Sequence, residues 1–184
     1  MSKFLQKFTV YDLIIAGLMA AVGIAIKPIV VPLTHIISGP LMIPGGAFAG
    51  GFYMMWLVMG FGITRKYGTA TLIGFIQALL VILGGAIGSH GILSLFSYTM
   101  PGLAADIGLF IIGHKVCCRP CAFIAGALAN LAGTLSVNFI FFRLPLLFLC
   151  LSLFTALLSG GLGGLLAWQL LSFIPKKLLN QFQN

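Results

Sequence analysis

The chain has 184 residues, of which 60% are hydrophobic and only 7% are charged. Soluble domains carry about 25% charged residues, and a globule of this size leaves too much surface in contact with solvent to hide so many apolar side chains. The composition excludes a soluble enzyme, a secreted disulfide scaffold and a disordered protein, and it predicts a chain embedded in lipid. Ten basic residues against two acids are typical of a protein that binds nucleic acid. Here, however, the basic residues lie at the ends of apolar runs, which indicates that they set the orientation of the chain in the membrane.

Apolar runs of about 20 residues, the length that crosses a bilayer, predict an all-α integral membrane protein built as a six-helix bundle. Residues 1–184 form a single membrane domain, with spans at about 11–26, 41–64, 69–88, 92–113, 121–142 and 146–173. The first span follows Lys3 and Lys7 as a signal peptide would, but we expect it to stay uncleaved. Pro28, Pro32 and Pro40 argue against a continuous helix between the first two spans, and we expect a lid there.

The basic residues alternate between the two sides of the predicted membrane domain. One side holds eight of them and the other holds two, Lys27 and Arg143. Because cytoplasmic loops carry an excess of lysine and arginine, this asymmetry places both termini in the cytoplasm. The eight cytoplasmic residues are Lys3, Lys7, Arg65, Lys66, Lys115, Arg119, Lys176 and Lys177.

The two acidic residues have different environments in the sequence. Asp12 follows Thr9 at the spacing of a capping box, which predicts a structural role at the start of the first span. Asp106 lies in an apolar stretch with no basic residue three or four positions away, so no neighbour on its own helix can pair with it. A polar group at bilayer depth is costly and is a functional candidate. Asp106 is either a ligand contact or an interhelical hydrogen bond.

Further polar and aromatic residues predict a pocket open to the outside. Asn130, Thr134 and Asn138 are four residues apart in turn and form one stripe on the fifth span. Each predicted residue can also serve as packing between helices, which is the commoner role. The residues that we expect to contact a ligand are Asp106, Gln77, Asn130, Asn138, Tyr53, Trp56, His90 and Thr99.

Small residues on the first span predict close helix contacts. Ala16 and Ala20, and then Ala21 and Ala25, are each four apart, so each pair lies on one helix face where a second backbone can approach. Internal packing explains most such residues in the chain. We expect this face of the first span to dock a separate membrane subunit.

Several catalytic signatures are missing from the sequence. No Gly-Lys pair occurs, so there is no phosphate-binding loop and the chain cannot hydrolyse ATP by itself. Two acids offer little general acid–base chemistry, and we expect no enzyme activity. Cys117, Cys118 and Cys121 match no zinc spacing. We expect reduced thiols on the cytoplasmic side, no metal site and no cofactor.

Three short motifs carry a resemblance to a known family. They are Ile43-Pro-Gly-Gly46, the turn Arg65-Lys-Tyr-Gly68, and the run Pro101-Gly-Leu-Ala-Ala-Asp106 preceded by Gly91. Together with the size and the alanine-rich first helix, they resemble the substrate-binding S component of an energy-coupling-factor (ECF) vitamin transporter, in the YkoE-like hydroxymethylpyrimidine/thiamine branch. Tyr67 stands where that branch has proline, and the amino terminus lacks the early histidine of nickel and cobalt relatives.

The resemblance implies a subunit that captures a vitamin or vitamin precursor from outside, with thiamine or hydroxymethylpyrimidine as the first guess. It also implies a multi-pass protein of a prokaryotic plasma membrane, whose partners are a transmembrane coupling subunit and two cytoplasmic ATPases. Asp106 would suit a cationic ligand such as thiamine as a counter-charge. Two alternatives stay open: a stand-alone proton-coupled transporter or exporter that uses Asp106, and a structural membrane subunit without a ligand.

Overall fold

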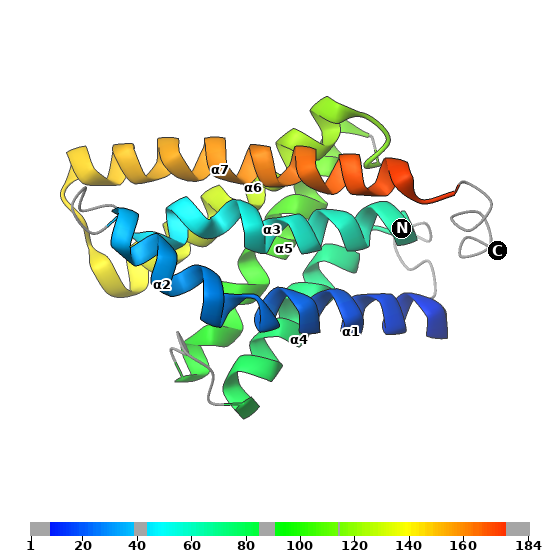
Figure 1. The fold of residues 1–184 in the computed structure, drawn as a ribbon, viewed down its shortest axis with the longest axis horizontal. Helices are drawn as coiled ribbons and strands as arrows, with labels where there is room; N and C mark the ends of the chain where they lie inside the picture. The colour runs from blue at the N-terminus through cyan, green and yellow to red at the C-terminus, as the bar shows by residue number, and fades with distance from the viewer. Residues whose placement is uncertain (1–7, 39–43, 85–90, 114, 176–184) are drawn as a thin grey trace.

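The computed structural model describes residues 8–38, 44–84, 91–113 and 115–175. Within these residues all regular structure is helical (Figure 1). The elements are α1 (Val10–Ala25), α2 (Lys27–Ser38), α3 (Gly45–Thr64), α4 (Thr69–Gly84), the 3-10 helix η2 (Gly91–Leu93), α5 (Ser94–Ile112), α6 (Arg119–Val137), the π-helix η3 (Asn138–Phe142) and α7 (Leu146–Phe173).

Four of these helical segments are long and apolar enough to cross a membrane, namely 45–64, 91–112, 119–142 and 146–173. A fifth span exists if α1 and the first part of α2, which are bent by 40° relative to each other, count as one. The apolar helix α4 has 16 residues, and the end of the predicted span 69–88 lies outside the described residues. The structure therefore shows a membrane bundle of helices, while six spans and cytoplasmic termini stay predictions.

The prediction that prolines prevent a helix between the first two spans was wrong. Residues 27–38 form α2, with Pro32 inside it. Pro28 lies in the first turn, where a backbone N–H has no helical partner and its loss costs little. Pro32 then removes one internal hydrogen bond, and α2 packs against α3. Pro40 and the rest of the expected lid, residues 39–43, lie outside the described residues.

The longest helices pack closely through faces that are lined with glycine residues. α7 packs against both α6 and α3, and each interface contains glycines whose missing side chains allow backbone contact. A Cβ atom on Gly126 of α6 would lie only 3.0 Å from the Cα of Gly164 of α7, and one on Gly163 would lie 2.7 Å from the Cα of Gly51 of α3. Lipid does not drive apolar helices together, so this close approach supplies much of the packing attraction.

The two ends of the bundle differ in what they contain. α1 begins and α7 ends at the same end, whereas α2 and the turn between α6 and α7 lie at the opposite end (Figure 1). Lys27 and Arg143, the two basic residues predicted to face outside, belong to that opposite end. The predicted segregation of charge is thus compatible with the arrangement of the helices.

Candidate binding site

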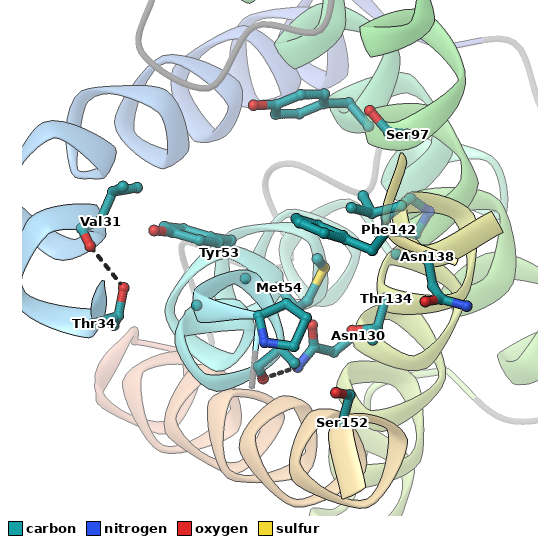
Figure 2. Close-up of a pocket in the computed structure, with 18 of the residues that line it drawn as sticks. Val31, Thr34, Tyr53, Met54, Ser97, Asn130, Thr134, Asn138, Phe142 and Ser152 are labelled. Atoms are coloured by element: carbon teal, nitrogen blue, oxygen red, sulfur yellow. Dashed lines mark hydrogen bonds between the residues drawn. The ribbon is translucent and has the colours of Figure 1, made fainter. Parts of the chain in front are cut away.

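A cavity of about 280 Å³ opens at the end of the bundle that carries α2. Its walls come from α2, α3, α5, α6 and η3, with single contributions from α4 and α7 (Figure 2). Apolar groups such as Val31, Met54, Leu57, Pro101 and Phe142 form most of the surface. A concave, mainly apolar site with a few converging polar groups is typical of small-molecule binding.

Lys27 lies at the start of α2 and lines this cavity between two tyrosines. Its Nζ atom donates a hydrogen bond to the hydroxyl of Tyr98 on α5. The same Nζ atom lies 3.8 Å from the ring centroid of Tyr98 and 5.0 Å from that of Tyr53 on α3. An ammonium group over aromatic faces is stabilised by the ring quadrupoles, by about 0.5–2 kcal/mol.

The polar stripe of α6 faces the cavity along its length. Asn130, Thr134 and Asn138 all line it, and all three side chains are buried. The amide of Asn130 donates to the carbonyls of Ala47, at 3.1 Å, and Ala156, at 2.8 Å, and so ties α6 to α3 and α7. Asn130 therefore has a structural role, and Asn138 has one as well, because its side chain accepts a hydrogen bond from the backbone.

The amide oxygen of Asn138 accepts a hydrogen bond of 3.0 Å from the backbone N–H of Leu144 and holds the turn into α7. Thr134 differs from both asparagines. Its hydroxyl is buried and has no hydrogen-bond partner within the described part of the chain, and the same holds for the hydroxyl of Tyr53. A buried polar group without a partner is costly, so these two hydroxyls are the groups of the cavity best suited to bind a ligand.

Sequence reasoning found part of this cavity and missed its charge. Of the eight residues expected to contact a ligand, Tyr53, Gln77, Asn130 and Asn138 line it. Trp56 and Thr99 are not among the described lining residues, and His90 lies outside the described part of the chain. The missed residues include Lys27, Ser97 and Tyr98. The charge pattern of the sequence predicts a topological role alone for Lys27, although Lys27 begins α2, which lines the site.

The structure places Asp106 away from the cavity, so its expected contact with the ligand stays a prediction without support from the lining. Asp106 is not among the described lining residues. One of its carboxylate oxygens accepts hydrogen bonds from the backbone N–H of Thr71, at 2.7 Å, and from the Thr71 hydroxyl, at 2.6 Å. Thr71 lies in the first turn of α4, where exposed N–H groups and the helix dipole favour a negative charge. This oxygen ties α5 to the start of α4, while the other carboxylate oxygen, Oδ1, is buried without a hydrogen-bond partner in the described part of the chain.

We predict that Asp106→Asn leaves ligand uptake per folded molecule unchanged, because its side chain can still accept from Thr71 and lies outside the cavity. Asp106→Ala removes the acceptor and should lower the free energy of unfolding by about 1–3 kcal/mol. Thermal melting of the two purified variants in the same detergent measures this difference. A loss of uptake by well-folded Asp106→Asn would show that this carboxylate acts in transport after all.

The alanines of α1 also need a correction. Ala16 and Ala20 have no exposed surface, because this face of α1 packs against α3 and α4. They are part of the internal packing and cannot meet a partner helix. Ala21 and Ala25 lie on the opposite, exposed face of α1. Of the four alanines expected to dock a partner, only Ala21 and Ala25 are exposed, and their docking role stays a prediction.

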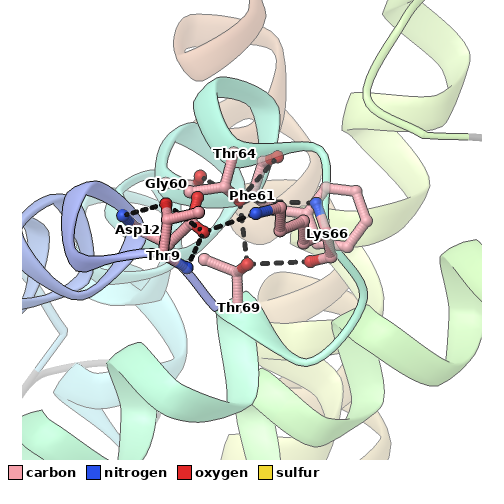
Figure 3. A network of polar contacts seen from close by, with 7 residues as sticks. All are labelled: Thr9, Asp12, Gly60, Phe61, Thr64, Lys66 and Thr69. Carbon is pink, nitrogen blue, oxygen red and sulfur yellow. Dashed lines mark hydrogen bonds and ion pairs between the residues drawn. The ribbon is translucent and has the colours of Figure 1, made fainter. Parts of the chain in front are cut away.

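Asp12 forms the capping box that its spacing from Thr9 predicts. The hydroxyl of Thr9 accepts from the backbone N–H of Asp12, and the Asp12 carboxylate accepts from the backbone N–H of Thr9 at 2.7 Å. The structure adds a partner from the turn after α3, because Lys66 places its Nζ atom 2.6 Å from the same carboxylate (Figure 3). Asp12 is completely buried and the Lys66 side chain is 15% exposed. This ion pair fastens the start of α1 to the turn between α3 and α4.

Cys117, Cys118 and Cys121 lie at the start of α6, away from the described lining of the cavity. The structure joins Cys118 to Cys121 by a disulfide, where reduced thiols were expected. Their sulfur atoms and that of Cys117 lie within 4.8 Å of one another. Cys118 is the N-cap residue of α6 and Cys121 lies in the first turn of this helix, so the two residues are close together.

Comparison with known proteins decides the family. The family model described as "ABC-type cobalt transport system, permease component" matches residues 11–132. The chain belongs to this transport family. Its fold is similar to that of a solved protein described as an S-component of an ECF transporter, with a TM-score of 0.79 and 21% identity, over 95% of this chain and 90% of that one. A search of curated protein sequences finds no match to this transport-family chain.

Proposed function

We propose that the chain is the substrate-capture (S) component of an ECF-type importer. It binds a small organic solute, of the size of a vitamin or vitamin precursor, in the cavity under α2. The observation that carries the proposal is this cavity of about 280 Å³, closed on one side by α2, in a chain with the S-component fold and membership of an ABC transport family. Lys27 and Arg143 mark the outward end, and both termini face the cytoplasm of a prokaryotic cell.

The lining favours an organic solute over a metal ion. Cobalt, which stands in the description of the family, is bound in proteins mainly by imidazole, thiolate and carboxylate groups. None of the described lining residues is a histidine, a cysteine or an acid. Thiamine loses its main support as well, because Asp106, its expected counter-charge, is engaged by Thr71. Hydroxymethylpyrimidine finds the hydroxyl and amide groups of Tyr53, Gln77 and Thr134 as partners, but it offers no negative charge to Lys27.

ATP-driven delivery requires partners that this chain does not contain. The exposed face of α1 with Ala21 and Ala25 is the proposed contact for the transmembrane coupling subunit, which in turn binds two cytoplasmic ATPases. Small side chains there allow a partner backbone to come close. A stand-alone transporter would need no such contact.

We expect Ala21→Trp to abolish co-purification of the coupling subunit and the ATPases, and ATP-dependent uptake with it, while thermal melting of the isolated chain changes by no more than 2 °C. The matched control is Leu162→Trp on the exposed face of α7, which is 60% exposed and should retain the partners. Uptake that persists in vesicles without ATPases and follows a proton gradient would favour the stand-alone transporter. Unchanged assembly of Ala21→Trp would place the docking surface elsewhere.

A further inference from the structure

Lys27 is a charged group in a cavity whose described lining contains no acid. Its ammonium is held by a hydroxyl and two aromatic rings, those of Tyr53 and Tyr98. Such rings reduce the cost of burying a cation but do not neutralise it. Burying an ionised group without a counter-charge is strongly unfavourable, so a bound anion would stabilise the ammonium form of Lys27.

The rest of the chain cannot supply that charge from an acidic side chain. The sequence contains two acids in all. Asp12 pairs with Lys66 at the other end of the bundle, and Asp106 accepts from Thr71 at the start of α4. Asp106 is also eight residues, or about 12 Å along the helix axis, from Tyr98, the residue of α5 that holds Lys27. Both acids are thus committed away from the cavity.

Resting on the proposed capture function, we propose that the transported solute carries a carboxylate, and that Lys27 is the residue that selects it. One lysine matches a monoanion, whereas a phosphate dianion would retain uncompensated charge in the same apolar site. The body of the solute occupies the apolar walls formed by Met54, Leu57 and Phe142. A cationic solute is excluded, because like charges in a site of low dielectric repel strongly.

The hydroxyls that lack partners in the described structure complete the recognition. The Tyr53 ring lies beside the Lys27 ammonium, and its hydroxyl has no hydrogen-bond partner among the described residues, so it can donate to the same carboxylate. The hydroxyl of Thr134 comes from a different wall, on α6 (Figure 2). It is therefore available to a second polar group of the solute. This division gives the ligand an orientation, with its acidic end at α2 and its other polar group at α6.

The test is a thermal-shift and calorimetric comparison of purified full-length protein with matched pairs of compounds. The pairs differ only in the acidic group: nicotinate with nicotinamide, pantothenate with panthenol, and biotin with its amide. Thiamine supplies a cation, and a short-chain phosphatidylglycerol supplies a lipid headgroup. The variants are Lys27→Met, Lys27→Arg and, as a charge-matched control at the same end of the bundle, Arg143→Gln.

We expect an acid to bind at least tenfold more tightly than its neutral partner, which corresponds to about 1.4 kcal/mol. Lys27→Met should abolish this preference, Lys27→Arg should retain part of it, and Arg143→Gln should leave it intact. Ligand-free Lys27→Met should melt at or above the temperature of the parent, because it loses an uncompensated buried charge, and this result shows that the variant folds.

Three outcomes would overturn the inference. Tighter binding of a neutral or cationic compound would refute the carboxylate but leave solute capture standing. Stabilisation by the lipid alone, or equal acid binding by Lys27→Met and the parent, would remove Lys27 from solute selection. If no compound of the panel binds at all, solute capture itself fails, and the carboxylate fails with it.

Discussion

Replacing Lys66 by methionine should lower the free energy of unfolding by about 3–5 kcal/mol, the usual cost of leaving one member of a buried ion pair alone. Asp12 has no exposed surface, and the Nζ atom of Lys66 lies 2.6 Å from its carboxylate. The capping interactions with Thr9 persist in the variant, but they do not neutralise the charge. We expect the start of α1 to detach from the turn between α3 and α4, which a large fall in melting temperature would report.

The double variant Asp12→Asn with Lys66→Met provides the decisive comparison. It removes both charges, and asparagine can still accept from the backbone of Thr9, so most of the lost stability should return. Lys115→Met is the control, because it removes a positive charge from another loop at the same end of the bundle. A double variant as unstable as Lys66→Met alone would mean that the lysine stabilises the fold through other contacts than Asp12.

Gly126→Leu should prevent α6 and α7 from packing and should yield little folded protein. A Cβ atom on Gly126 would lie 2.9 Å from the backbone nitrogen and 3.0 Å from the Cα of Gly164. Backbone atoms cannot rotate away as a flexible side chain can, so the helices must separate. Gly126→Ala, the milder change, should already cost about 1–3 kcal/mol through overpacking.

Gly126→Ala should also distort the wall of the cavity, because Asn130, which lines it, lies one turn further along α6. Separation of the helices would lengthen the hydrogen bond from Asn130 to Ala156. Gly17→Ala on α1 is the matched control, since nothing lies within 4 Å of its added Cβ; alanine there should stabilise the helix by about 0.5–1 kcal/mol. Normal melting of Gly126→Ala would show that the interface tolerates a wider spacing than the structure has.

The features that the sequence predicts correctly all depend on local patterns. Apolar runs of bilayer length predict the long helices that the structure contains. The reason is that backbone N–H and C=O groups in lipid must form their hydrogen bonds within their own segment. The spacing of Thr9 and Asp12 predicts the capping box, because both partners lie in one turn. The period of Asn130, Thr134 and Asn138 predicts one polar face of α6, and the structure turns that face toward the cavity.

The features that the sequence mispredicts depend on which face of a helix meets another helix. Ala16 and Ala21 belong to equally plausible small-residue pairs, and only packing against α3 and α4 buries the first and exposes the second. Similarly, α2 forms with Pro32 inside it and packs against α3. Burial of a helix face is a property of its neighbours, which the spacing of residues along the helix does not specify.

Local sequence thus determined the membrane-embedded, all-helical character of the protein, the cap of its first helix and the polar stripe of α6. Tertiary structure decided which charged residue lies at the candidate site. From the sequence, Asp106 was the isolated ion and Lys27 a topological marker. In the fold, the start of α4 supplies hydrogen bonds to Asp106, whereas Lys27 meets Tyr53 and Tyr98 at the cavity. The physical reason is that a charge is compensated by groups close in space, and these come from other helices.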